Sequence, residues 1–164
     1  MQSTLNVAIV GYRGSGKTTL CYRLAGLDPP NKPNGTTCLD YLACTWNNKH
    51  NVLLWDFAPG VSRHTEQHLR DMDCVVLCCD GRNNRSALSA LQFLKAHKCP
   101  VVVALTRMTA LTWCVPLFLA DTGRTAYGTR VFPCYYSADS LMSHLHRQYL
   151  GDRHLLTSSR TVEL

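Results

Sequence analysis

Residues 11–18 of this 164-residue chain read Gly-Tyr-Arg-Gly-Ser-Gly-Lys-Thr, which matches the pattern G-x-x-x-x-G-K-[ST]. The apolar run at residues 5–10 predicts a buried strand before this stretch, and residues 18–24 predict a helix after it. Glycines permit positive φ and leave backbone N–H groups open to an anion at the start of the helix. The stretch therefore predicts a phosphate-binding loop, with contacts from Gly11, Arg13, Gly14, Ser15, Gly16, Lys17, Thr18 and Thr19.

Oxygen-bearing side chains near this loop are candidates for a Mg²⁺ site. Lys17 would place a positive charge on the β- and γ-phosphates, and the Thr18 hydroxyl would ligate Mg²⁺. Asp56 ends an apolar run, and a carboxylate at the end of a buried strand can hold Mg²⁺ through a water. Thr36 follows a proline-rich loop, and its hydroxyl would complete the Mg²⁺ shell when a γ-phosphate is present. We therefore expect Thr18, Asp56 and Thr36 to form the metal site.

Strand-like apolar runs alternate with helical patterns along most of the chain. The polar residues 47–50 predict a hairpin between the second and third runs, and Leu88, Leu91 and Leu94 have helical spacing. This alternation predicts a doubly wound α/β domain with a mainly parallel six-stranded sheet and one antiparallel edge strand. We expect the domain to span residues 1–150 and residues 151–164 to form a flexible tail. The predicted strands are residues 5–10, about 38–46, 51–56, 73–79, 100–105 and 131–135, and residues 138–150 form a further predicted helix.

The composition fits a single globular domain in the cytoplasm. The longest apolar runs are too short to span a bilayer, and no signal-peptide pattern is found at the N-terminus. The net charge of +6 is diffuse and lacks a nucleic-acid-binding motif, so no nucleic-acid partner is expected. The nine cysteines form no C-x-x-C pair, so we expect core packing instead of a metal site or disulfides. The cysteines in apolar runs are Cys74, Cys78, Cys79 and Cys134.

Five motifs, in chain order, resemble those of Ras/Rab-type small GTPases, and the resemblance covers roughly residues 4 to 150. After the phosphate loop, residues 36–41 are similar to the Rab switch I sequence T-I-G-V-D-F, and residues 55–60 to the switch II sequence W-D-T-A-G-Q. Residues 101–109 and 137–139 lie where the family has N-K-x-D and S-A-K. The resemblance implies a monomer that binds GTP or GDP with Mg²⁺ and contacts effector or regulator proteins through residues 36–41 and 60–70.

Substitutions in these motifs predict slow hydrolysis. Arg13 stands where Ras-type proteins usually have glycine, and a bulky side chain there obstructs the attacking water and an incoming arginine finger. Pro59 stands at the switch II glycine and has no N–H for the γ-phosphate. Gly60 stands at the glutamine position or, after a one-residue slip, at the γ-phosphate glycine with Val61 at the glutamine position. Neither register supplies a glutamine to orient water, so no catalytic residue is assigned.

The base-reading motif lacks the family's aspartate. Thr106, Arg107 and Thr109 occupy its positions, and a threonine hydroxyl cannot replace a carboxylate that accepts two N–H bonds. The resemblance still implies that the aliphatic part of the Arg107 side chain lies over the base. It also implies that the backbone N–H groups of Ser137 and Ala138 lie near a base carbonyl. We therefore expect a relaxed preference for guanine.

Two functions are consistent with these features. The first is a nucleotide-binding switch with slow hydrolysis, which the intact phosphate loop favours. The second is a pseudoGTPase scaffold that mediates protein interactions without turnover, which Pro59 and the altered base-reading motif favour. No lipid anchor is expected, because residue 2 is Gln2 and the chain closes with Arg160-Thr161-Val162-Glu163-Leu164, which has no prenylation cysteine.

Overall fold

The structure is a computed structural model that describes residues 4–31, 39–46, 50–60, 63–80, 84–96, 100–106, 118–119, 124–125 and 131–133, together with residues 141, 143, 145 and 147. All structural statements concern these residues. The elements in chain order are β1 (Thr4–Gly11), α1 (Lys17–Leu24), β2 (Asp40–Trp46), β3 (His50–Asp56), α2 (Arg63–Leu69), β4 (Cys74–Asp80), α3 (Asn84–Ala96), β5 (Val101–Thr106), β6 (Phe118–Leu119), β7 (Arg124–Thr125) and β8 (Val131–Pro133).

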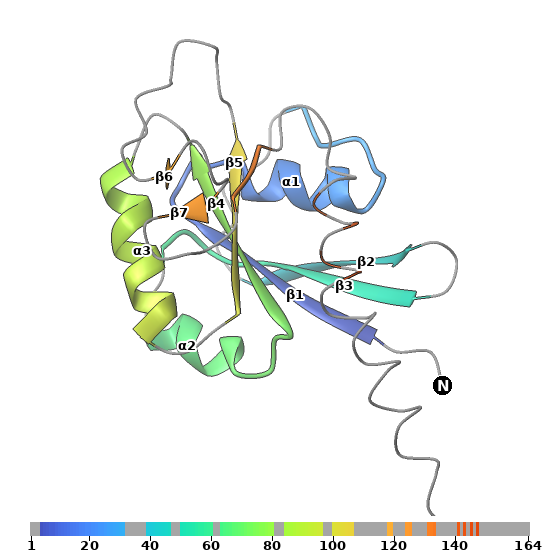
Figure 1. The fold of residues 1–164 in the computed structure, drawn as a ribbon. Helices are drawn as coiled ribbons and strands as arrows, with labels where there is room; N and C mark the ends of the chain where they lie inside the picture. The colour runs from blue at the N-terminus through green and yellow to red at the C-terminus, as the bar shows by residue number, and fades with distance from the viewer. Residues whose placement is uncertain are drawn as a thin grey trace, which may run out of the picture.

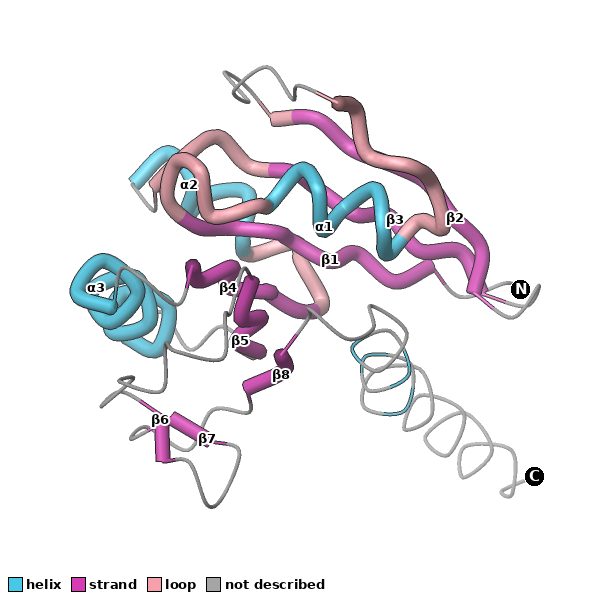
Figure 2. The backbone as a smooth tube through the Cα atoms, turned by 90° about the horizontal axis from the view of Figure 1, so that it is seen from above, coloured by secondary structure: helices cyan, strands magenta, loops and turns pink. Residues whose placement is uncertain are grey.

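The strands form a mixed sheet in the order β2-β3-β1-β4-β5-β8 (Figures 1 and 2). β2 pairs with β3 in antiparallel fashion, which confirms the predicted hairpin and antiparallel edge. The other pairs in this sheet are parallel. β8 has three residues that pair with β5, so a longer sixth strand over residues 131–135 stays a prediction. β6 and β7 form a separate two-stranded ribbon that the sequence did not predict.

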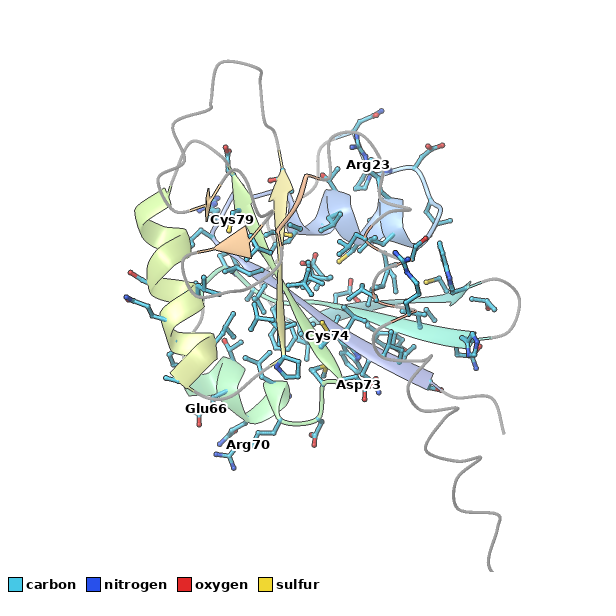
Figure 3. The ribbon with its side chains drawn as sticks, viewed as in Figure 1. Arg23, Glu66, Arg70, Asp73, Cys74 and Cys79 are labelled. Atoms are coloured by element: carbon cyan, nitrogen blue, oxygen red, sulfur yellow. The ribbon has the colours of Figure 1, made fainter. Side chains whose placement is uncertain are left out.

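Burial along the strands follows their place in the sheet. Nearly every residue of the central strands β1 and β4 is buried, because the sheet is covered on both faces there. The edge strand β2 instead alternates half-buried and exposed residues. Asp73 lies directly before β4 (Figure 3). The Asn6 N–H donates to the Asp73 carboxylate at 2.8 Å, and the Asp73 N–H donates to the Asn6 carbonyl at 2.9 Å. These two bonds fix β4 beside β1.

Two apolar clusters lie on the two faces of the sheet, with α1 on one side and α2 and α3 on the other (Figure 1). On the α1 face, Leu20 and Leu24 pack with Leu141 and Leu145. On the other face, the buried side chains of the helices are Leu69 of α2 and Ala90, Leu91 and Leu94 of α3. This arrangement confirms helices on both faces, and it places the N-terminus of α1 at the carboxyl end of β1.

The predicted helices and buried cysteines agree with the structure wherever it describes them. α3 contains Leu88, Leu91 and Leu94, whose spacing predicted a helix, and residues 141, 143 and 145 are helical. Cys74, Cys78 and Cys79 are buried free thiols, whereas Cys134 and the predicted tail at 151–164 lie outside the described residues. In the described part of the chain, no helix is both long and apolar enough to cross a bilayer.

Candidate nucleotide-binding site

The phosphate loop runs from the end of β1 to the start of α1, and its backbone requires glycine. A Cβ on Gly11 would lie 2.6 Å from the Cys78 carbonyl oxygen and 2.8 Å from Ser15 Oγ, so no larger residue fits. Gly14 and Gly16 have φ values of 76° and 87°, in the left-handed region. The Ser15 N–H donates to the Tyr12 carbonyl at 3.1 Å and closes the turn. The shape of the loop is therefore set by its glycines and by this backbone hydrogen bond.

The start of α1 is suited to an anion. Its N-cap is Gly16, and no side chain caps it by a hydrogen bond. The first turn of the helix contains no acidic residue of its own, so no carboxylate within that turn offsets the positive end of the helix dipole. Ser15 Oγ is buried and has no hydrogen-bond partner among the residues that the structure describes. An oxyanion at this helix end would find unoccupied donors, which fits a phosphate.

Lys17 is a buried cation at the centre of the site. Lys17 is 5% exposed, and its Nζ donates to the Tyr12 carbonyl at 3.0 Å. Burial lowers the pKa of Lys17 below 10.5, and the charge of Asp56 opposes that shift. A buried ammonium is stabilised by nearby negative charge, which a phosphate would add. The Tyr12 carbonyl is a partner that sequence reasoning missed, because a main-chain acceptor leaves no residue signature.

The Thr18 hydroxyl and the Asp56 carboxylate meet beside Lys17. Thr18 Oγ1 donates to Asp56 Oδ2 at 2.6 Å, which joins the first turn of α1 to the end of β3. Asp56 is 6% exposed. A hydroxyl and a carboxylate are hard oxygen donors of the kind that Mg²⁺ prefers, so the pair fits that ion. Thr36, the third predicted ligand, lies outside the described residues.

The segment that follows β3 is tied to the phosphate loop by its backbone. The Phe57 N–H donates to the Ile9 carbonyl at 3.1 Å, and the Gly60 N–H donates to the Gly11 carbonyl at 3.0 Å. Gly60 was predicted to contact the nucleotide, but here its N–H is bonded to the loop itself. Arg13 is exposed and Thr19 is half-buried.

Thr106 lies at the end of β5, next to the phosphate loop. Its hydroxyl is within hydrogen-bonding distance of the Ser15 carbonyl and lies 3.2 Å from the Cys79 carbonyl. The contact of Thr106 with a base stays a prediction, and in this structure its hydroxyl meets main-chain oxygens. The other predicted base-contacting residues lie outside the described residues, namely Arg107, Thr109, Ser137 and Ala138.

A glycine turn between a parallel strand and a helix, with a buried lysine and a threonine–aspartate pair, defines the class of P-loop nucleotide-binding folds. The chain belongs to the family described as 50S ribosome-binding GTPase, whose model matches residues 6–107. This match supports the predicted P-loop GTPase but not the Ras/Rab type in particular. A comparison with curated proteins gave no match.

Among solved structures, the chain is similar to Era, in a crystal structure of Era with MgGDPNP and nucleotides 1506–1542 of 16S ribosomal RNA. The TM-score is 0.53 and the sequence identity is 21%, over 64% of this chain and 41% of that chain. The likeness at this identity shows the fold alone. The chain thus matches less than half the length of that Era chain.

Proposed function

We propose that the chain binds a Mg²⁺–guanine nucleotide at the phosphate loop and hydrolyses it slowly. The observation that carries this proposal is the buried Lys17 ammonium beside the Thr18–Asp56 pair. These three groups supply a positive charge for the phosphates and oxygen ligands for the metal. Membership of a GTPase family supports guanine nucleotide and Mg²⁺ in general.

Each group has a distinct role in this proposal. Lys17 binds the β- and γ-phosphates, and the N–H groups of the loop bind the phosphate oxygens between them. Thr18 and Asp56 hold Mg²⁺, which neutralises phosphate charge when bound, and Thr36 adds a third oxygen. The direct bond from Thr18 to Asp56 keeps both side chains in place before the ion arrives.

Slow turnover follows from the residues around the γ-phosphate position. Pro59 has no N–H, and the N–H of Gly60 is donated to the Gly11 carbonyl. Gly60 and Val61 cannot orient an attacking water at the position where the family has glutamine. Arg13 is exposed and stands where Ras-type proteins usually have glycine. We assign no catalytic residue.

Relaxed guanine specificity follows from the altered base-reading motif. Thr106, Arg107 and Thr109 offer no carboxylate acceptor, and the N–H groups of Ser137 and Ala138 remain the proposed donors to a base carbonyl. A site without this carboxylate binds purine nucleotides with a smaller preference for guanine than a site in which a carboxylate accepts two N–H bonds from the base.

Partner proteins would bind through residues 36–41 and 60–70. Tyr41 is 55% exposed and its ring lies against that of Trp55 in a tilted arrangement, with ring centroids 5.1 Å apart. The exposed Arg70, directly after α2, pairs with Glu66 of α2 at 3.4 Å (Figure 3). An exposed aromatic side chain and an exposed charged pair are features that suit protein contact. Action as a Ras/Rab-like switch is part of this proposal, as are a domain of residues 1–150 and a flexible tail at 151–164.

A scaffold without turnover is the second candidate. The bond between Gly60 and Gly11 favours it, because this contact ties the segment after β3 to the loop. Partner binding that persists in a Lys17→Ala variant would favour the scaffold over the switch.

The test of the proposed function is the nucleotide that co-purifies with the protein. Purified wild-type protein and a Lys17→Ala variant are denatured, and released nucleotides are identified by mass spectrometry. The proposal expects guanine nucleotide from the wild type at close to one per chain, and a strong reduction in the variant. Release of no nucleotide, combined with no binding of added Mg²⁺–GTP, would exclude it.

A further inference from the structure

Thr106 lies against the two residues that precede Lys17. It is the last residue of β5 and pairs with Asp80 of β4. Its hydroxyl faces the carbonyl of Ser15 as well as that of Cys79. A Cβ on Gly16 would lie 3.5 Å from both Thr106 Cβ and Thr106 Oγ1, which is van der Waals contact. Thr106 therefore contacts the loop by a hydrogen bond to Ser15, and its side chain lies close enough to Gly16 to touch any side chain added there.

The hydroxyl contact determines the direction of an amide. A hydroxyl has one proton, and here the two oxygens that face it belong to the main chain. In a trans peptide the carbonyl of Ser15 and the N–H of Gly16 point in opposite directions. Because Thr106 holds the Ser15 carbonyl toward β5, the Gly16 N–H points away from β5. That N–H belongs to the set proposed to bind phosphate.

We infer that Thr106 is a positioning residue for the phosphate loop and that it acts on the phosphates independently of the base. The inference rests on the proposed nucleotide binding and extends it. It differs from the base contact expected of this sequence position, because a positioning residue affects every polyphosphate equally. A base-contacting residue would affect only ligands that carry a base.

The test compares a nucleotide with a polyphosphate that lacks a base. Affinities for Mg²⁺–GTP and for Mg²⁺–tripolyphosphate are measured by calorimetry in wild-type protein and in Thr106→Val, which has the same shape but no hydroxyl. Thr106→Ala is a second variant without the hydroxyl, and Thr106→Ser restores it. Thr45→Val, at an exposed position on the edge strand β2, is the matched control. Thermal unfolding of each protein checks that it is folded.

We expect Thr106→Val to lower the affinity for both ligands by the same factor, about 5- to 10-fold, as for one lost hydrogen bond. We also expect faster hydrogen exchange at the Gly16 amide, rescue by Thr106→Ser, and no change in Thr45→Val. A loss confined to GTP would overturn the inference in favour of a base contact, and unchanged affinity for both ligands would also overturn it. If wild-type protein binds neither ligand, the proposed function itself fails.

Discussion

At the residue scale, the contacts of Pro59 and Gly60 bear on how the site would distinguish a triphosphate from a diphosphate. Pro59 has no N–H to donate, and Gly60 donates its own to the Gly11 carbonyl at 3.0 Å. A γ-phosphate therefore gains no amide from Pro59, and it gains the Gly60 amide only if the bond to Gly11 breaks. We expect GTP and GDP to bind with similar affinity.

Restoring the missing amide tests this view. Pro59→Gly adds one N–H at the position where the resemblance places a γ-phosphate donor, so affinity for GTP should rise about 5- to 10-fold relative to GDP. Competition binding with the two nucleotides measures the ratio. Pro30→Gly, in the loop after α1, is the control and should leave the ratio unchanged. Equal changes for GTP and GDP in Pro59→Gly would count against an amide contact.

A second residue-scale prediction concerns the Cys79 thiol. Burial raises the pKa of Cys79 from 9.0 to about 12. Above pH 9 the thiol ionises in the unfolded chain but stays protonated in the folded chain, so the free energy of unfolding falls as pH rises. One such thiol contributes a slope of about 1.4 kcal/mol per pH unit. In the Cys79→Ala variant, the free energy of unfolding should therefore fall less steeply with pH than in the wild type. Urea unfolding between pH 8 and pH 10.5 measures this slope.

The control for Cys79 is a neighbour that does not titrate. Val103 is buried in the same cluster, and Val103→Ala should lower stability by a similar amount at every pH. If the slope of Cys79→Ala equals that of the wild type, Cys79 does not stay protonated in the folded protein.

At the scale of elements, α1 positions the site because its buried face fixes it on the sheet. Leu20 is 3% exposed and packs in the cluster of the α1 face, whereas Arg23 is exposed on the same helix (Figure 3). Leu20→Ala should lower the free energy of unfolding by about 2–5 kcal/mol. Arg23→Ala should change it by less than about 1 kcal/mol. Chemical denaturation measures both, and similar losses in the two variants would refute the assignment of faces.

The elements that the sequence predicted well are those with strong periodicity. Buried elements need apolar side chains at regular positions. The apolar runs of β1 and β4 and the leucine spacing of α3 show this pattern, so these elements could be predicted from the sequence. The phosphate loop was predictable because its glycines and lysine are required by geometry and charge.

Contacts made by the main chain could not be predicted. The Tyr12 carbonyl that accepts from Lys17 and the bond from Gly60 to Gly11 depend on loop conformation, and no residue type marks them. The base contact expected of Thr106 stays a prediction, whereas the contact of its hydroxyl with the Ser15 carbonyl is another main-chain contact that the residue type does not reveal. The ribbon of β6 and β7 has two residues per strand, too few for any pattern.

At the scale of the whole molecule, sheet topology brings the functional groups together. Lys17 and Thr18 come from α1, Asp56 from the end of β3 and Thr106 from the end of β5. Because these parallel strands end at one edge of the sheet, groups from residues 17 to 106 meet around one loop. The family match over residues 6–107 covers the same span. The site thus depends on the sheet as a unit.

The most direct measurement of the central claim is calorimetric titration of Mg²⁺–GTP into nucleotide-free protein. The wild type should give saturable heat that disappears when Mg²⁺ is chelated. Lys17→Ala should bind more than about 10-fold more weakly, because a charged hydrogen bond to phosphate is lost, and Arg23→Ala should bind like the wild type. Absence of saturable heat from folded wild-type protein, or equal affinity in Lys17→Ala, would contradict the account.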